Sequence, residues 1–318
     1  MGHTERNQMA AIFELPHFQD ADAARAYLEN LRWANGVVCP HCGVIGGHYE
    51  LKGKSTRPGV YKCGACSDQF TVTVGTVFER SKIKLHIWLQ AVHLMSASKK
   101  GMSAKQIERM LGVSYKTAWF MCHRIREAMT TDYASTDKMG GPNTIVEADE
   151  TYWGYLYPAR AGSGHKMKVV SLVERESGQK RSFHVANVTA ETVSAVLKSQ
   201  VHPETHLMTD ESRIYNKIGK EFAAHSTVNH GRKEYARGNV TSNTVEASFA
   251  IFKRGLKGTF HSVSERHLQR YANEFDFRWN TRSANGFNDV DSADAALKGI
   301  AGKRLTYRRT NSVQAAHL

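Results

Sequence analysis

Three acidic side chains occupy positions from which carboxylates could act together on a phosphodiester. Asp149 and Asp210 each end a short run, TIVEAD and THLMTD, that predicts a β-strand. Glu246 lies in NTVEASFAIFKRGLK, residues 243–257, where apolar residues recur with the period of a helix. If the two strands are neighbours in a sheet, their terminal acids meet at one edge, and the helix can bring Glu246 there. The three charges would repel one another unless divalent cations lay between them, which is the arrangement for two-metal phosphoryl transfer.

The helix predicted around Glu246 has two interpretations. Asn243 lies one turn before Glu246 and Lys253 two turns after it, so the three side chains project from nearly the same side. A carboxylate followed two turns later by a basic residue can hold a metal beside a phosphodiester. The sequence Asn-x-x-Glu before an apolar run also fits a capping box, with Asn243 as the N-cap and Glu246 at the third helical position. On this segment alone both interpretations stay open.

Four of the five cysteines form two CxxC pairs separated by twenty residues, and they are Cys39, Cys42, Cys63 and Cys66. Two such pairs can close tetrahedrally around Zn²⁺. The segments YELKG, GVYKC and QFTVT predict the short strands of a zinc ribbon. His41 could compete as a ligand, and Cys122 is expected to be a buried apolar thiol on a helix. Because four thiolates leave no open coordination position, the predicted zinc is structural.

Residues 103–126 have the pattern of a helix-turn-helix. SAKQIERML and YKTAWFMCHRIR predict two helices, Gly112 supplies the sharp turn between them, and Ser114 caps the second. The second helix of this motif enters the DNA major groove with its N-terminal residues at the bases. The candidate base readers are Tyr115, Lys116 and Thr117, and the candidate phosphate contacts are Arg124 and Arg126. An ordinary three-helix unit with a basic exposed face is the alternative.

The composition favours a polyanionic partner. The chain of 318 residues carries a net charge of +13 and has a pI near 9.5, and no basic amphipathic segment points to a membrane surface. No apolar run reaches the roughly 18 residues of a membrane span, and the N-terminal sequence has no apolar signal core. We therefore expect a nucleic-acid partner, no membrane and a reducing cytoplasm, where the cysteines act as ligands or free thiols.

The order of the predicted elements indicates a multidomain α/β chain. From residue 144 onward the pattern is three strands, helix, strand, helix, strand, helix, which predicts a mixed sheet with flanking helices. The expected divisions are an N-terminal helix and zinc ribbon at 1–80, a helical helix-turn-helix domain at 81–131, a linker at 132–143, the mixed-sheet core at 144–302 and a basic tail at 303–318.

The motifs and their order resemble a known family. RWANGVVCPHCG, the second CxxC, FTVTVGTVFERS, VEADETYWG, LMTDESRIY, TSNTVEASFAIFKRGLKGTFHSV and RYANEFDFRWNTR follow one another over roughly residues 20–282. Together they resemble prokaryotic insertion-sequence transposases of the DDE type that have an N-terminal zinc ribbon. The resemblance implies that the mixed-sheet core has a ribonuclease-H-like fold.

The resemblance also implies roles for the acidic residues. Asp149 and Asp210 correspond to the two catalytic aspartates. For the third position, Glu246 has a basic residue seven positions later, as in related groups, whereas members of this group are also described with an asparagine, which would be Asn243. We favour Glu246, because a carboxylate brings charge as well as an oxygen donor to Mg²⁺.

Further residues could serve the same site. Strand alternation places Glu147 on the face of Asp149, so Glu147 could be an accessory acid. Lys253 and Arg254 could hold DNA phosphates or form a solvated basic helix face. His230, in VNHGRKEYARG, could lie near the site or contact DNA or backbone from a loop.

The function implied by the resemblance is metal-assisted cleavage at the end of a mobile element, followed by attack of the freed 3′ hydroxyl on target DNA. Mg²⁺ is the expected catalytic metal, and Mn²⁺ can substitute at oxygen-rich sites. The implied partners are duplex terminal inverted repeats and target DNA. Pairing of two element ends implies a homodimer or higher oligomer on DNA in the bacterial cytoplasm, at the nucleoid. Two alternatives are a non-catalytic DNA-binding regulator and a related nuclease that cuts without strand transfer.

Overall fold

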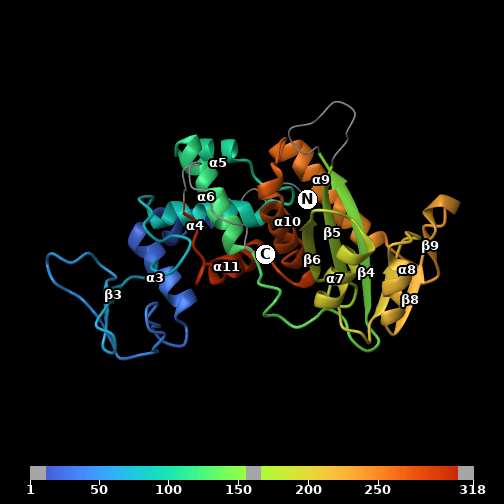
Figure 1. The fold of residues 1–318 in the computed structure, drawn as a ribbon. Helices are drawn as coiled ribbons and strands as arrows, with labels where there is room; N and C mark the ends of the chain where they lie inside the picture. Colours follow the sequence, from blue (N-terminus) through green and yellow to red (C-terminus); the bar gives the residue numbers. More distant parts are fainter. Residues whose placement is uncertain (1–11, 155–165, 307–318) are drawn as a thin grey trace. The chain divides into compact units, whose positions relative to one another are not determined.

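The computed structural model describes residues 12–154 and 166–306, and Figure 1 shows its fold. The chain divides into two compact units. The N-terminal unit comprises Met1–Ala97, Ala104–Met129 and Ala293–Leu318, and the core unit comprises Ser98–Ser103 and Thr130–Ser292. The expected zinc-ribbon and helical domains thus fall within one unit. Within the described residues, no helix is long and apolar enough to cross a membrane.

The N-terminal unit begins with short helix α2 (Pro16–Gln19) and helix α3 (Ala21–Arg32). As the sequence predicts, Asp20 caps α3: its carboxylate accepts hydrogen bonds from the backbone N–H groups of Asp22 and Ala23, both at 2.8 Å. Ala24 and Leu28 form the buried stripe of α3, which packs against helix α4 (Leu85–Ala97).

The zinc ribbon has three short antiparallel strands in the order β1-β2-β3. They are β1 (His48–Glu50), β2 (Tyr61–Cys63) and β3 (Gln69–Phe70), within or beside the three segments predicted. The small sheet has an aromatic core in place of a large aliphatic one. Trp33 meets Tyr61 edge-on at 5.3 Å between ring centroids, and Tyr61 stacks on Phe70 at 5.8 Å.

The helix-turn-helix is present as predicted, with helices α5 (Ala104–Leu111) and α6 (Tyr115–Ala128). Gly112 adopts a φ of +64°, a left-handed conformation that costs other residues energy and closes the sharp turn. The Ser114 hydroxyl accepts a hydrogen bond from the backbone N–H of Thr117 at 3.3 Å, which caps α6.

The C-terminal boundary of the core differs from the prediction. Residues 293–302 were expected in the core, but they belong to the N-terminal unit. There Val77 N donates to Ile300 O at 3.2 Å, and Gly302 N donates to Gly75 O at 2.9 Å. Helix α11 (Asp289–Lys298) therefore begins in the core unit and ends in the N-terminal unit. Residues 307–318 of the expected basic tail lie outside the described residues.

The core unit is built on a five-stranded sheet in the order β6-β5-β4-β7-β8. Its strands are β4 (Ile145–Trp153), β5 (Met167–Glu174), β6 (Lys180–Val185), β7 (His206–Thr209) and β8 (Ala224–Thr227). The first three form an antiparallel meander, and β7 and β8 run parallel to β4. This order and these directions are those of a ribonuclease-H-like fold, as expected.

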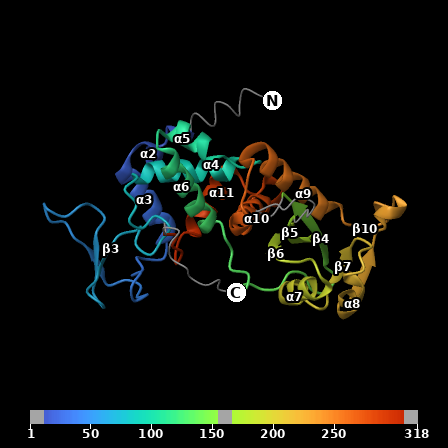
Figure 2. The ribbon, with the colours of Figure 1, turned by 45° about the horizontal axis from the view of Figure 1, so that its top comes forward.

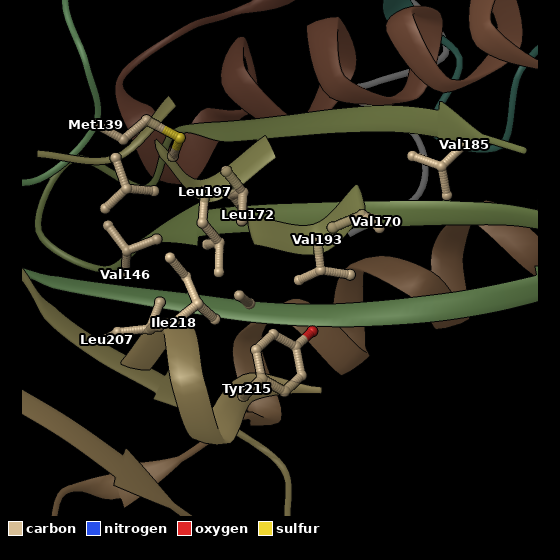
Figure 3. Packing of buried hydrophobic residues seen from close by; sticks show 12 residues of the cluster. Met139, Val146, Val170, Leu172, Val185, Val193, Leu197, Leu207, Tyr215 and Ile218 are labelled. Carbon is tan, nitrogen blue, oxygen red and sulfur yellow. The ribbon is translucent and has the colours of Figure 1, made fainter. Parts of the chain in front are cut away.

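Helices cover both faces of this sheet (Figure 2). On one face, α7 (Ala190–Gln200) and α8 (Tyr215–Ile218) pack against Val146, Ala148, Val170 and Leu172 in an apolar cluster (Figure 3). On the other face, α9 (Asn243–Gly255) and α10 (Glu265–Asn280) pack against Met167 and Val169. The alternation of side chains along β4 and β5 assigns even and odd positions to different faces, which fixes the direction of each acid on β4.

Two segments hold more structure than the sequence indicated. The polar loop before α9 contains a short 3-10 helix, η2 (His230–Arg232), and a hairpin of β9 (Ala236–Arg237) and β10 (Val240–Thr241). The expected linker at 132–143 lies within the core unit. Its Met139 is buried and forms a backbone bridge with Val201, so this segment packs on the core.

Candidate active site and zinc site

The sheet places Asp149 beside Asp210. Strands β4 and β7 pair in parallel, with Ile145 opposite His206, Val146 opposite Leu207 and Glu147 opposite Met208. Continuing the same register along both chains brings Asp149 level with Asp210, and neighbouring residues of adjacent strands point to the same face. Asp149 Oδ1 accepts a hydrogen bond from Glu150 N at 2.7 Å, and Asp210 Oδ1 accepts one from Ser212 N at 3.0 Å.

Helix α9 carries Glu246 to this face of the sheet. Its carboxylate accepts a hydrogen bond from the Ser242 hydroxyl at 2.6 Å, and His230 Nε2 lies 3.0 Å from Glu246 Oε1. The capping-box interpretation of this segment is wrong. The N-cap is Ser242, whereas Asn243 is the first helical residue and is exposed to solvent. Glu246 therefore contacts a side-chain hydroxyl and not the backbone N–H that a capping box would offer.

The electrostatics show that the three acids influence one another. Burial, with smaller contributions from the charges of Glu150, Asp210 and Glu246, raises the pKa of Asp149 to about 8. Burial also raises the pKa of Asp210, with a smaller contribution from Glu246. Such clustered, partly buried carboxylates with few donors fit a divalent cation, because hard cations prefer oxygen ligands and neutralise the repulsion.

The carboxylates of this site are spaced more widely than the zinc-ribbon cysteines. Within residues 12–154 and 166–306, the four cysteines alone bring three or more ligand atoms within 4.8 Å of one another.

The two other acids of β4 have partners that occupy them. Glu147 lies on the face of Asp149, as alternation predicts, but it is fully buried and accepts hydrogen bonds from Arg175 and from the first turn of α9. It is therefore closed to the accessory role considered for it. Glu150 lies on the opposite face, where it accepts a hydrogen bond from the Tyr215 hydroxyl at 2.8 Å.

Residues of two loops complete the site, and the sequence did not determine their positions. His230 contacts Glu246, which decides between the alternatives left open for it. Glu211, directly after Asp210, accepts hydrogen bonds from the backbone N–H groups of His230 and Gly231 at 2.9 and 3.0 Å. Glu211 thus fixes the turn that carries His230. In the sequence, Glu211 is distinguished only by its position beside Asp210. That position does not reveal its contact with His230, 19 residues later.

The basic residues of α9 are accessible. Lys253 and Arg254 are both exposed near the end of the helix, and Arg254 Nε donates to Ala250 O at 3.1 Å. Beyond them the helix continues as a π-helical turn, Leu256–Phe260, which contains exposed Lys257. This end of the helix presents positive charge to solvent.

The residues proposed from the helix-turn-helix divide into two groups. Tyr115 is 46% exposed and Lys116 is exposed at the start of α6. Thr117 is partly buried, with its hydroxyl 2.9 Å from that of Ser114. These positions suit a recognition helix.

Arg124 and Arg126 do not suit phosphate contacts in this structure. Arg126 is 2% exposed. Arg124 is partly buried and donates to the backbone carbonyls of Leu305 and Glu79, both at 3.2 Å. Both guanidinium groups lie on the packed side of α6. Helical periodicity alone did not predict that these two arginines are buried or partly buried.

The four predicted cysteines meet at one point. The distances between the sulfur atoms are 3.7 Å for Cys39 and Cys66 and 3.7 Å for Cys42 and Cys63. The backbone N–H of Cys66 donates to Cys63 Sγ at 3.5 Å and lowers the pKa of Cys63 to about 6, which favours the thiolate that ligates metal. This donor set fits a structural tetrahedral Zn²⁺ site. His41 is exposed and outside the set, and Cys122 is buried, as predicted.

Family models match the two segments that contain these sites. The family model of the ISXO2-like transposase domain matches residues 139–280, and that of the transposase zinc-ribbon domain matches residues 19–69. The chain is 29% identical over 273 residues to an uncharacterized protein in transposable element ISH50 of Halobacterium salinarum (strain ATCC 700922 / JCM 11081 / NRC-1), which covers 79% of this chain and 88% of the relative.

Solved structures give a weaker likeness. The simian T-cell lymphotropic virus intasome in complex with PP2A regulatory subunit B56 gamma matches with a TM-score of 0.29 and 15% identity, over 54% of this chain and 63% of that one, less than two thirds of its length. The HTLV-2 integrase catalytic core domain in complex with magnesium, in its dimeric form, matches with a TM-score of 0.27 and 18% identity, over 44% of this chain and 86% of that one. Both TM-scores are too low to add to the assignment.

The two matched domains follow one another in the order that the motifs predicted, and each contains the residues expected to act in it. The chain therefore belongs to the DDE transposases of insertion sequences, with a transposase zinc ribbon preceding an ISXO2-like transposase domain.

Proposed function

We propose that this transposase cuts duplex DNA at terminal inverted repeats and joins the freed 3′ end to target DNA, with Asp149, Asp210 and Glu246 as the catalytic acids. The observation that carries the proposal is the register of β4 and β7, which sets Asp149 beside Asp210 on the face reached by Glu246. Three acids from distant segments converge there. The family assignment supports the same reaction class.

The acids would hold two divalent cations, Mg²⁺ with Mn²⁺ as a substitute. Such ions activate the attacking oxygen and stabilise the leaving oxygen of an in-line displacement. The work of the protein is to hold its carboxylate oxygens in place: β4 and β7 fix the two aspartates, and Ser242 and His230 orient Glu246. Asn243, one turn earlier on the same helix, is the second candidate for the third position.

The same proposal assigns DNA contacts to exposed residues. Lys253 and Arg254 would contact phosphates near the acids, because α9 carries both of them as well as Glu246. Tyr115, Lys116 and Thr117 would read bases at the start of α6. The partners are duplex terminal repeats and target DNA in the cytoplasm, at the nucleoid. Because two element ends must be brought together, the active form would be a homodimer or higher oligomer.

The test is Mg²⁺-dependent cleavage of a terminal-repeat duplex by wild type, Asp210→Asn, Glu246→Gln and Asn243→Ala, with duplex binding measured in parallel. We expect Asp210→Asn and Glu246→Gln to bind DNA without cutting it, and Asn243→Ala to cut. Cleavage by Glu246→Gln but not by Asn243→Ala would move the third role to asparagine. A wild type that binds but never cuts with either metal would instead be a regulator.

Strand transfer needs its own assay. A duplex with a preformed 3′ hydroxyl end bypasses the cleavage step, so joining to a target plasmid can be measured alone. The proposal predicts joined products that depend on Asp210. Cleavage without any joining would identify a nuclease.

A further inference from the structure

Glu147 is fully buried, yet its carboxylate has no free acceptor position. Oε1 accepts hydrogen bonds from Arg175 Nε at 2.6 Å and from the Thr244 hydroxyl at 3.0 Å. Oε2 accepts hydrogen bonds from the backbone N–H groups of Thr244 at 2.8 Å and Val245 at 2.9 Å. An ionised carboxylate offers about four lone-pair positions, so these donors fill it. Glu147 therefore cannot also ligate a cation, and its charge is used within the protein.

Arg175 extends this contact to the chain that enters α9. Its Nη1 donates to the carbonyl and side-chain oxygens of Asn239 at 2.8 and 3.0 Å, and its Nη2 donates to Thr241 O at 2.8 Å. The arginine side chain is 15% exposed. Thr241 ends β10 and is followed directly by the N-cap Ser242. Glu147 and Arg175 thus hold both the last residues before the helix and its first N–H groups.

We propose that Glu147 is a positioning residue which, together with Arg175, sets the place of α9 and therefore of Glu246 relative to Asp149. Glu147 lies two residues before Asp149 on the same face of β4. Its carboxylate accepts a hydrogen bond from the backbone N–H of Val245, and Glu246 is the next residue of the helix. The hydrogen-bonded anchor is thus two residues along the strand from Asp149 and one residue along the helix from Glu246. The role rests on the proposed function, because it concerns the geometry of the cutting site.

Apolar packing alone would not give this control. Val245 and Phe249 of α9 pack on Val173 of β5, which keeps the helix on the sheet. Apolar contacts are weakly directional, whereas hydrogen bonds lose strength steeply when their angle or length changes. Three of the four hydrogen bonds to Glu147 come from Thr244 and Val245 of α9. They therefore determine the position of α9 along its axis and its rotation about that axis. The direction of the Glu246 side chain follows from both.

The test compares Glu147→Gln with the matched control Glu174→Gln. Glutamine keeps the size of Glu147 but places an NH₂ group against Arg175 or the α9 amides, which are themselves donors. Glu174 lies on the neighbouring strand, and its carboxylate accepts a backbone hydrogen bond from Gly140 N at 2.8 Å, so this control loses the same kind of contact away from α9. Arg175→Lys is the milder variant, since lysine keeps the charge but not the fork that reaches Asn239 and Thr241.

Three quantities are measured on each full-length protein: single-turnover cleavage against Mg²⁺ concentration, duplex affinity, and hydrogen exchange of the peptide that contains Thr244 and Val245. Partners that orient metal ligands typically change metal affinity or activity about 10- to 100-fold. We expect Glu147→Gln to lose cleavage, or to need more Mg²⁺, within that range. Duplex affinity should stay unchanged and exchange at Thr244 and Val245 should become faster. Arg175→Lys should be intermediate, and Glu174→Gln should match wild type.

Other outcomes overturn the inference. Cleavage by Glu147→Gln at the wild-type rate, with faster exchange at Thr244 and Val245, would show that α9 can loosen without harm to the site. Equal losses in Glu147→Gln and Glu174→Gln would reduce Glu147 to a general contributor to folding. Should Glu147→Gln not fold, Arg175→Lys decides: a wild-type rate and Mg²⁺ dependence would refute the role. A wild type that never cuts refutes the proposed function and this role together, whereas a cutting wild type isolates the role.

Discussion

Neighbouring carboxylates of this protein differ in the number of donors that reach them. Glu147 is satisfied by four hydrogen bonds, whereas Asp149, two residues later, accepts one from the part of the chain that the structure describes, donated by Glu150 N. Asp210 and Glu211 show the same contrast, since Glu211 holds two backbone N–H groups of the His230 turn. An acid with few donors is available to a cation, and an acid with many serves the fold.

His230→Ala tests how the site holds Glu246. The variant removes the imidazole that lies 3.0 Å from Glu246 Oε1, so we expect cleavage to fall about 10-fold with duplex affinity unchanged. Single-turnover cleavage at saturating DNA measures this. The matched control is His202→Ala, which removes a histidine of the core unit whose contacts are with Glu204. Equal rates in the two variants would contradict a role for His230.

At this scale, the sequence predicted the aspartates better than their supporting residues. Asp149 and Asp210 could be found because each lies in or directly after a run with strand character, and strand position determines direction. The expectation that Asp149 ends its strand is wrong, because β4 continues to Trp153. Glu211 and Arg175 could not be found, because their partners lie in a loop whose short helix and hairpin have no periodic pattern. Ser242, which donates to Glu246, ends the same loop. The capping box was misread for a related reason: Asn243 and Ser242 are both good N-caps, and only the chain path shows that the helix begins one residue earlier than predicted, at Asn243.

At the scale of elements, helix faces decide which basic residues remain available. The start of α6 leaves Lys116 exposed, whereas Arg126 further along the same helix is buried. The sequence predicted both helices and the turn correctly from Gly112 and Ser114. The sequence could not distinguish exposed basic side chains from buried ones. The aliphatic part of an arginine side chain packs like an apolar residue, and its burial depends on the neighbouring elements.

Lys116→Ala should therefore change DNA affinity, whereas Arg126→Ala should change the stability of the fold. Loss of an exposed phosphate or base contact lowers duplex affinity. If the contact is to a phosphate, the slope of the logarithm of the binding constant against the logarithm of the salt concentration falls in magnitude by about one. Arg126→Ala removes a buried side chain and should destabilise the protein by more than about 1 kcal/mol. Salt-dependent binding and thermal unfolding measure the two effects. Arg126→Ala that melts like wild type but binds DNA more weakly would reverse the assignment.

The zinc ribbon depends on its metal more than on its small core. We expect one zinc per chain by metal analysis, lost in Cys63→Ser and retained in Cys122→Ala, because Cys122 lies outside the four-sulfur cluster. Removing zinc with a chelator should unfold the ribbon, seen as faster hydrogen exchange in β1 to β3, since such sites couple metal binding to folding. Full protection of these strands without zinc would contradict a structural metal.

At the scale of the whole molecule, the two units do not follow the order of the chain. The segment from Ala293 onward joins the N-terminal unit, and Ser98–Ser103 joins the core unit. A linear reading of the sequence assigns each segment to the domain beside it and therefore missed both exchanges. The core sheet was predictable in the number of its strands and in their succession with helices along the chain, because strand patterns and the family motifs coincide there.

The cost of ionising Asp149, which comes first from its burial and then from the neighbouring acids, should be visible in the stability of the whole protein. The folded pKa of Asp149, about 8, is above its ordinary value of 3.8, so the stability linked to its protonation is present below about pH 4 and is lost as the pH rises through 8. Without divalent cations, Asp149→Asn should melt at the wild-type temperature near pH 4 and about 2 °C or more above it at pH 8.

Thermal unfolding with and without Mg²⁺ or Mn²⁺ measures this. Added cation should raise the melting temperature of wild type more than that of Asp149→Asn, because binding to the folded state stabilises it. Asp137→Asn, an exposed acid of the same unit, is the control and should leave the pH dependence unchanged. A lower melting temperature for Asp149→Asn at every pH would show that Asp149 stabilises the fold.

The most direct test of the catalytic site is single-turnover cleavage by Asp149→Asn at saturating Mg²⁺ and saturating terminal-repeat duplex. The loss of a metal ligand should exceed the roughly 10- to 100-fold effect of a supporting residue, so we predict at least about a 100-fold fall in rate. DNA affinity and folding, measured on the same samples, should match wild type. A variant that binds and cuts like wild type would show that Asp149, and the part of the sheet where it lies beside Asp210, is not the place where this transposase cuts DNA.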